Sequence, residues 1–199
     1  MLLVVTGCTS NAKEDVSESE TPSQASEKEN TSDQSQKNTD DYSDWSTFYN
    51  PVGKNLDTLY FDGPPWTPSE MGLSRAFIPD TECAILVTSY LDELNGDDVF
   101  EAATKKAFSN FNSVISCENI DVSEKKEVNI NGMDMIHYVG TTYDAKSETD
   151  LYVTGYVFEF KNAANGVMGI VFDKEQSKDL IKMVTEYTDH LVTTVRETQ

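Results

Sequence analysis

A polar tract between residues 9 and 44 limits how this chain can fold, because the tract has almost nothing to bury. Before Tyr42, its only apolar side chain larger than alanine is Val16. The tract carries ten acidic residues against three lysines, a net charge of −7. So little apolar surface does not offset the entropy lost on folding, and we therefore expect residues 9–44 to form a disordered, acidic, Ser/Thr-rich linker.

Residues 45–199 contain nearly all the large apolar and aromatic side chains and form the expected folded domain. A domain of about 150 residues buries roughly 68–70% of the surface of its unfolded chain, which supports a core without disulfide staples. The whole chain has a net charge of −20, of which the linker accounts for −7 and this domain for −13. Such an excess of carboxylates repels phosphate backbones, so no nucleic-acid partner is expected.

Residues 1–8 end in Val5-Thr6-Gly7-Cys8, an apolar residue and two small residues before a cysteine. This run resembles the lipobox of bacterial lipoproteins, in which the thiol receives a diacylglyceryl group, so Cys8 is the predicted lipid-attachment residue. Only seven residues precede it, without Lys or Arg, whereas a secretory signal has a basic start and about 7–15 apolar residues. Residues 1–8 therefore indicate a truncated lipoprotein signal, and the alternative is a frayed apolar terminus with an incidental cysteine.

The lipobox resemblance implies a location for the protein. A lipid on Cys8 places it on the extracytoplasmic face of the cell membrane of a Gram-positive-like envelope, with the membrane as a partner through the anchor. Two acyl chains anchor stably where one binds only reversibly, at about 0.8 kcal/mol per buried CH₂. No other stretch approaches the roughly 18 apolar residues of a transmembrane helix.

Capping residues and apolar spacing predict two helices. Asp98 and Glu101 have the spacing of a capping box, which starts a helix over residues 99–111. Asp173 and Gln176 repeat that spacing before the last helix. The apolar stripes are Phe100, Ala103, Ala107 and Phe111 in the first helix, and Leu180, Ile181, Val184, Tyr187, Leu191 and Val195 in the second.

Short apolar runs and turn signals predict five strands. Residues 84–91 (AILVTSYL) form a short, mainly apolar run rich in strand-forming residues, as in a strand buried on both faces. Asn131-Gly132 is a strong turn signal between strands at residues 126–130 and 133–143. A second hairpin pairs residues 151–161 with residues 167–172 around the segment from Asn162 to Gly166.

Residues 45–71 are expected to be irregular, because prolines interrupt them at Pro51, Pro64, Pro65 and Pro68. The predicted order is then one strand, one helix, four antiparallel strands and a last helix. Short hairpins favour a meandering sheet, and two amphipathic helices are positioned to cover it.

The pattern formed by AILVTSY, DDVFEAATKKAF, NING, YVFEF, GIVFD and the last helix resembles the Mog1/PsbP-like fold, including PsbP-like bacterial lipoproteins. The resemblance covers residues 71–197. It implies an α+β fold in which an antiparallel β-sheet is sandwiched by helices. It also implies a binding or assembly-assisting module, and it supplies no catalytic residues.

The residues themselves offer little support for catalysis or for metal binding. His137 falls in a predicted strand and His190 in the last helix, neither beside a nucleophile, and no nucleophile-elbow or nucleotide-binding motif occurs. Acidic clusters at residues 92–98 and 144–150 contain oxygen ligands, but they lack the EF-hand spacing. We therefore expect no catalytic residue, no metal and no cofactor.

Cysteines and aromatic side chains leave two alternatives open. Cys83 and Cys117 either form a disulfide or remain buried free thiols. The aromatic side chains of residues 45–66 either hold a ligand or pack onto the sheet, with packing favoured. The candidate ligand-binding residues are Trp45, Tyr49 and Trp66.

These observations favour a lipid-anchored, extracytoplasmic binding or interaction module of the cell envelope that is not an enzyme. Its partner is an unidentified protein or cell-wall component. One alternative is a hydrolase acting on envelope material through loop carboxylates such as Asp144 and Glu148, which requires a raised pKa at one of them. Another alternative is a structural accessory in the assembly of a larger complex.

Overall fold

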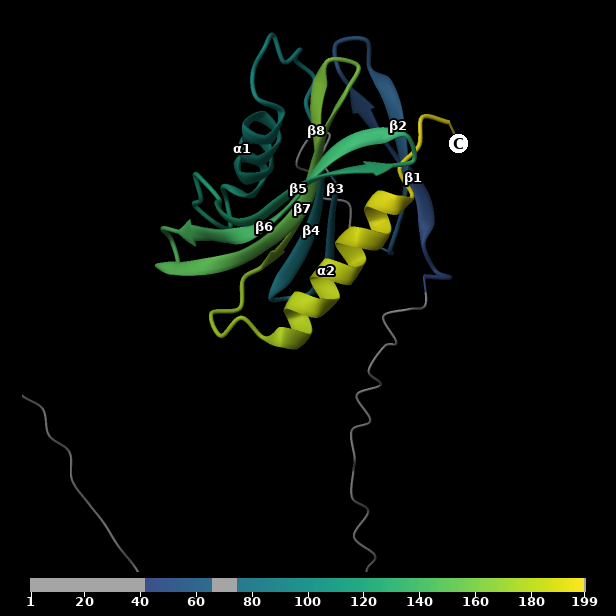
Figure 1. Ribbon diagram of the computed structural model, residues 1–199. Coiled ribbons are helices and arrows are strands. Elements are labelled where there is room, and N and C mark those ends of the chain that lie inside the picture. The colour runs from purple at the N-terminus through teal and green to yellow at the C-terminus, as the bar shows by residue number, and fades with distance from the viewer. Residues whose placement is uncertain (1–41, 66–74, 199) are drawn as a thin grey trace, which may run out of the picture. The chain divides into compact units, whose positions relative to one another are not determined.

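Eight strands and two helices make up the part of the chain that a computed structural model describes, residues 42–65 and 75–198 (Figure 1). The predicted signal with Cys8, the linker as far as residue 41, and Trp66 lie outside those residues. Neither helix in the described ranges has the length and hydropathy needed to span a bilayer. The elements are β1 (Ser46–Val52), β2 (Asp57–Gly63), β3 (Arg75–Asp80), β4 (Cys83–Ser89), α1 (Val99–Phe111), β5 (Asp121–Ile130), β6 (Met133–Asp144), β7 (Thr149–Phe160), β8 (Ala163–Val171) and α2 (Lys178–Thr193).

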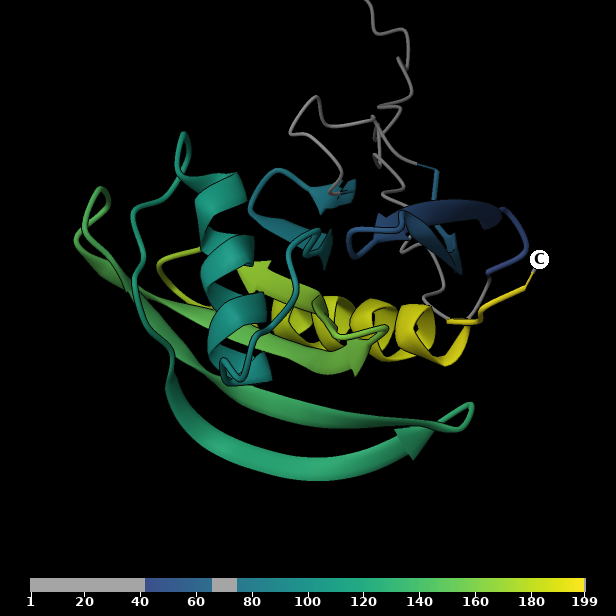
Figure 2. The ribbon, with the colours of Figure 1, turned by 90° about the horizontal axis from the view of Figure 1, so that it is seen from above.

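Six antiparallel strands form the main sheet, in the order β3-β4-β8-β7-β6-β5. All residues of β4 and β8 are buried, as the apolar run at residues 84–91 predicts for a strand covered on both faces. Figure 2 shows β5 and β6 as long, curved strands along one side of the sheet. The predicted α+β class, with an antiparallel sheet and two helices, is confirmed.

Helix α1 covers one face of the sheet and has the predicted bounds. The Asp98 carboxylate accepts a hydrogen bond from the Glu101 N–H at 3.0 Å, which confirms the cap. Phe100, predicted in the buried stripe, is only half-buried, and its ring meets the Tyr138 ring edge-on at 5.1 Å. The side chains that α1 buries against this face are Ala103, Thr104, Ala107, Phe108 and Phe111.

Helix α2 covers the opposite face, and its predicted capping box is wrong. The Asp173 carboxylate accepts from the N–H groups of Glu175 and Ser177, both at 2.9 Å, and so forms a turn before the helix. Gln176 has a φ of 48° and lies outside the helix, which begins at Lys178. The Asp173 carboxylate thus accepts from nearby backbone N–H groups and forms no capping box with Gln176.

The prediction of an irregular segment before residue 71 is wrong for β1 and β2, which form a two-stranded antiparallel sheet. Pro51 fits β1 because this strand has a neighbour on one side only, and a missing N–H costs little at an edge. Phe48 and Phe61 face the main sheet and stack at 5.4 Å, within the core that also contains the end of α2. The hairpin thus covers part of the face that α2 leaves open.

The sequence analysis also misses β3 and misplaces one turn. Strand β3 is an edge strand, so Pro79 is tolerated there. The turn between β7 and β8 is formed by Lys161 and Asn162, with φ values of 52° and 60°. Asn165, predicted within the turn, pairs with Phe158 in the ladder, because the sheet continues past the second Asn-Gly pair.

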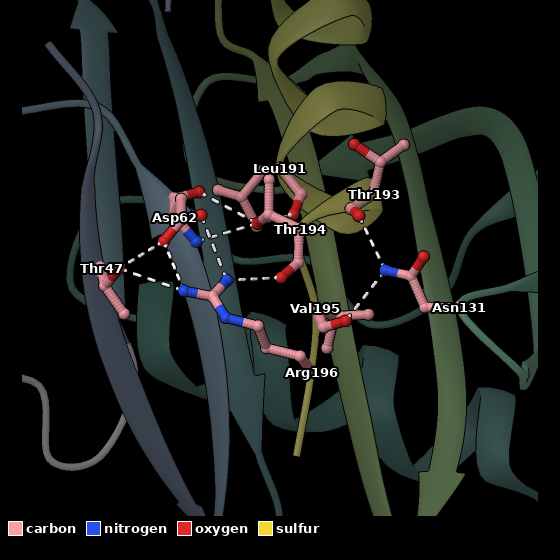
Figure 3. Close-up of polar contacts among 8 residues, drawn as sticks. All are labelled: Thr47, Asp62, Asn131, Leu191, Thr193, Thr194, Val195 and Arg196. Atoms are coloured by element: carbon pink, nitrogen blue, oxygen red, sulfur yellow. Dashed lines mark hydrogen bonds and ion pairs between the residues drawn. The ribbon is translucent and has the colours of Figure 1, made fainter. Parts of the chain in front are cut away.

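Arg196 fastens the residues after α2 to the β1–β2 hairpin (Figure 3). Its guanidinium forms two hydrogen bonds with the Asp62 carboxylate, at 2.9 and 3.1 Å, and another with the Thr47 hydroxyl at 3.1 Å. The backbones of Arg196 and Tyr60 exchange hydrogen bonds of 2.8 and 3.0 Å. The Arg196 hydrogen bonds outweigh burial and lower the pKa of Asp62.

We expect Arg196→Ala to lower the free energy of unfolding by about 1 kcal/mol, because a bidentate charge-assisted pair is lost from a partly exposed site. Urea unfolding measures the change. The matched control is Lys126→Ala, which removes an ion pair to Glu124 that is more than half exposed on both sides. An equal loss of stability in the two variants contradicts a fastening role for Arg196.

Candidate functional site

A pocket of about 590 Å³ lies between α1 and the segment that connects α1 to β5. Figure 2 shows this connection running from the end of α1 to the start of β5. The volume of the pocket falls within the range of roughly 300–1,000 Å³ that is typical of small-molecule sites. Apolar side chains form much of the lining, namely Phe100, Phe108, Ile115 and Ile120, and Glu101 and Lys105 add opposite charges.

The wall of the pocket opposite α1 is held in place by Asp144, at the end of β6. The Asp144 Oδ1 atom accepts from the Ser116 N–H at 2.6 Å and from the Lys146 N–H at 3.1 Å. Its Oδ2 atom accepts from the N–H and hydroxyl of Ser147, at 3.0 and 2.6 Å. A second link runs from the Thr142 hydroxyl to the Asn119 carbonyl at 2.7 Å.

These bonds make Asp144 a positioning residue and not an acid catalyst. Burial by itself raises the pKa of Asp144, but the hydrogen bonds from Ser147, Ser116 and Lys146 outweigh burial and lower it to about 2. A general acid needs the opposite shift. Glu148, the other carboxylate proposed for a hydrolase, is exposed on the neighbouring turn.

Gly140 allows the connection to approach the sheet closely. A Cβ atom at this position would lie 2.3 Å from the Asp121 carbonyl oxygen and 3.0 Å from the Ile120 side chain. Only glycine therefore fits where β5 begins beside β6. The pocket depends on this approach because Ile120 forms part of its lining.

Cys117 lines the pocket, and its thiol is free and half-buried. Cys83 is also free and is fully buried against α2, on the other face of the sheet. The free-thiol alternative for this pair is the one observed. Burial raises the pKa of both thiols, that of Cys83 to about 11, so neither is an activated nucleophile.

The structure describes two of the three predicted ligand-binding aromatic residues, Trp45 and Tyr49, and gives them different surroundings. The Trp45 ring stacks on the Tyr187 ring of α2 at 5.6 Å and meets Tyr42 and His190 edge-on, so it packs against the helix. Tyr49 is 56% exposed on the outer face of β1. Trp66 lies outside the described residues. Neither Trp45 nor Tyr49 lines the pocket beside α1.

The structure does not gather the histidines and acidic clusters into a set of metal ligands in the part of the chain that it describes. His137 is buried beside Tyr156, at 4.8 Å between ring centroids, and its Nδ1 atom has no hydrogen-bond partner. Burial lowers the pKa of His137 and of His190, which stacks on Tyr42 at 3.6 Å. Among residues 42–65 and 75–198, no three His, Cys, Asp or Glu side chains converge as metal ligands.

The sequence analysis did not find the pocket, because its walls come from segments that only the folded chain brings together. One local signal was available for Asp144, because Ser147 follows it by three residues. This spacing is typical of an Asp whose carboxylate accepts hydrogen bonds from the turn that it begins. Nothing local indicated the bond to Ser116, which is 28 residues away.

The solved structures to which this chain is similar include two proteins. A protein of unknown function, PA94, from Pseudomonas aeruginosa has 12% sequence identity and a TM-score of 0.42, over 70% of this chain and 92% of that chain. Cyanobacterial PsbP (CyanoP) from Synechocystis sp. PCC 6803 has 8% sequence identity and a TM-score of 0.46, over 77% of this chain and 92% of that chain. No protein-family model matches this chain, and no curated protein matches its sequence. At these scores, membership of the PsbP-like family stays a prediction.

We expect Asp144→Asn to destabilise the protein by about 1–3 kcal/mol, because an amide leaves backbone N–H groups without their charged acceptor. The folded-state pKa of Asp144 is lowered from 3.8 to about 2, so its stabilising effect is present above pH 4 and is lost as the pH falls toward 2. Urea unfolding at several pH values measures both effects.

The matched control for Asp144→Asn is Glu148→Gln, an exposed substitution with the same change of charge. Its effect should stay within about 0.5 kcal/mol. The stability difference between wild type and Asp144→Asn should narrow as the pH falls from 4 toward 2. A difference that is independent of pH contradicts the role assigned to the ionised carboxylate.

Proposed function

We propose that this protein is a non-catalytic binding module, attached through a lipid on Cys8 to the extracytoplasmic face of the cell membrane. The observation that carries the binding role is the pocket beside α1. It is open to solvent, has the volume of a small-molecule site, and combines four aromatic or aliphatic side chains with Cys117 and eight polar or charged residues.

The chemistry of the pocket favours binding over catalysis. Its thiol, Cys117, has a raised pKa, and the carboxylate behind its wall, Asp144, has a lowered one. Catalytic acids, bases and nucleophiles need shifts in the opposite directions. The hydrolase alternative therefore loses Asp144, one of the two carboxylates that it named.

The lining indicates an amphiphilic ligand of low molecular weight. Phe100, Phe108 and Ile120 offer apolar contact, whereas Glu101 and Lys105 are exposed and offer charges of both signs. An apolar body with a polar end fits such a surface, because the body leaves water while the end stays hydrated.

Nile red, a neutral apolar dye, tests the pocket in the full chain carrying Cys8→Ser. Cys83 is fully buried, so N-ethylmaleimide should react at Cys117 and place a bulky group in the pocket. We expect dye fluorescence to rise on binding and to fall at least about tenfold after alkylation, as a lost apolar contact of this size predicts.

The matched control is the same chain with Cys117→Ser added, which should bind the dye before and after the reagent. Dye binding that alkylation leaves unchanged overturns the proposed pocket. Mass spectrometry confirms that a single thiol has reacted.

Metabolic labelling with a fatty-acid probe tests the anchor. The wild-type chain, expressed behind a complete secretory signal, should incorporate the probe, and Cys8→Ser should not, because the acyl group needs the thiol. Equal labelling of the two chains rejects the lipid anchor and leaves the binding pocket to be judged by the dye experiment.

A further inference from the structure

A second groove, of about 560 Å³, lies at the N-terminal end of α1, over β5, β6 and β7. Figure 2 shows the β5–β6 hairpin continuing past α1, so α1 does not cover this part of the sheet. The groove shares no lining residue with the pocket beside α1. It is therefore a separate surface and does not depend on the function proposed above.

The floor of this groove is apolar. Ile136 of β6 and Val157 of β7 are register partners and point to the face of the sheet that carries α1. Val99, the first residue of α1, completes the floor, and both Ile136 and Val99 remain partly exposed. Partly exposed aliphatic side chains of this kind gain free energy when a ligand covers them.

The rim of the groove is acidic. Glu127, Asp134 and Glu159 line it from three neighbouring strands, and all three side chains are exposed. Asp134 accepts a hydrogen bond from Asn129 at 2.7 Å, but within the described residues none of the three carboxylates forms an ion pair.

The nearest basic residue along the same strand face does not neutralise this rim. Lys125 precedes Glu127 by two residues on β5, and its ammonium lies 4.4 Å from the centre of the Phe100 ring. The other lysines that pair with carboxylates do so elsewhere, as Lys126 does with Glu124 on the opposite face of β5. The groove therefore keeps an uncompensated negative charge around an apolar floor.

We propose that this groove binds a short basic segment of a partner protein, in which lysine or arginine side chains flank apolar ones. The apolar side chains lie on Ile136 and Val99, the partly exposed residues of the floor, and the cationic ends reach the three rim carboxylates. Long basic side chains suit this arrangement because their stems cover apolar surface while their charged ends reach outward. Charge complementarity also favours such a partner over an acidic one, which the net charge of −20 repels.

A fluorescently labelled peptide of alternating lysine and leucine is the probe, measured by fluorescence anisotropy on the full chain with Cys8→Ser. We expect the triple variant Glu127→Gln, Asp134→Asn, Glu159→Gln to bind about tenfold more weakly, as three lost exposed ion pairs predict. The substituted side chains are all exposed, so the fold should be unchanged, and circular dichroism checks this.

The matched control is the triple variant Glu82→Gln, Glu148→Gln, Glu175→Gln, which removes the same charge from exposed positions outside the groove. It should change the affinity by less than about twofold, because distant exposed charges are screened. An equal loss in the two triple variants shows general electrostatic attraction and overturns the proposal.

Two further peptides test the apolar floor and the sign of the charge. A lysine–serine peptide should bind at least about tenfold more weakly than lysine–leucine, because the floor gains nothing from serine. A glutamate–leucine peptide should not bind. Equal binding of lysine–serine and lysine–leucine, or binding that alkylation of Cys117 abolishes, overturns the assignment to this groove.

Discussion

Burial of both faces of β4, β7 and β8 is the constraint on which the rest of the structure depends. Strands without a polar face need other elements to cover both of their faces. One helix, α1, lies over one face, whereas the other face needs both α2 and the β1–β2 hairpin. The segments at the two ends of the described chain therefore meet on the same face, and Arg196 joins them through Asp62.

Capping and turn residues correctly predicted the helix start and the hairpin turn that depend on neighbouring residues alone. The Asp98 cap gave α1 its true start, and Asn131-Gly132 formed the turn expected of it, with φ values of 54° and 82°. Prolines misled the analysis before residue 71, because their cost depends on whether a strand has one neighbour or two. That number of neighbours is a tertiary property, and no local pattern encodes it.

The candidate pocket could not be predicted from the sequence, because it too depends on tertiary contacts that no local pattern encodes. Asp144 is one of several loop carboxylates in the sequence, and its type alone fits an acid catalyst, a metal ligand or a turn residue. The backbone donors of Ser116, Lys146 and Ser147 decide among these, since they stabilise the ionised form. The donor that fixes the pocket wall comes from the connection after α1, far away in the sequence.

The two surfaces beside α1 differ in chemistry as well as position. The pocket runs along α1 from Phe100 to Asn112 and mixes both charges, whereas the groove lies at Val99 and carries one sign of charge. Because they share no residue, a ligand in one leaves the lining of the other intact. A single helix thus separates two independent surfaces.

The packing of Trp45 on α2 has a mechanical consequence. A pulling force applied through the residues before Tyr42 first loads the stack of Tyr42 on His190, then the rings of Trp45 and Tyr187, and only then reaches β1. Strand β1 has a single hydrogen-bonded neighbour, and its first residue pairs with the last residue of β2, so such a force would peel the hairpin open one pair at a time. The six-stranded sheet would stay unstrained while the hairpin yields.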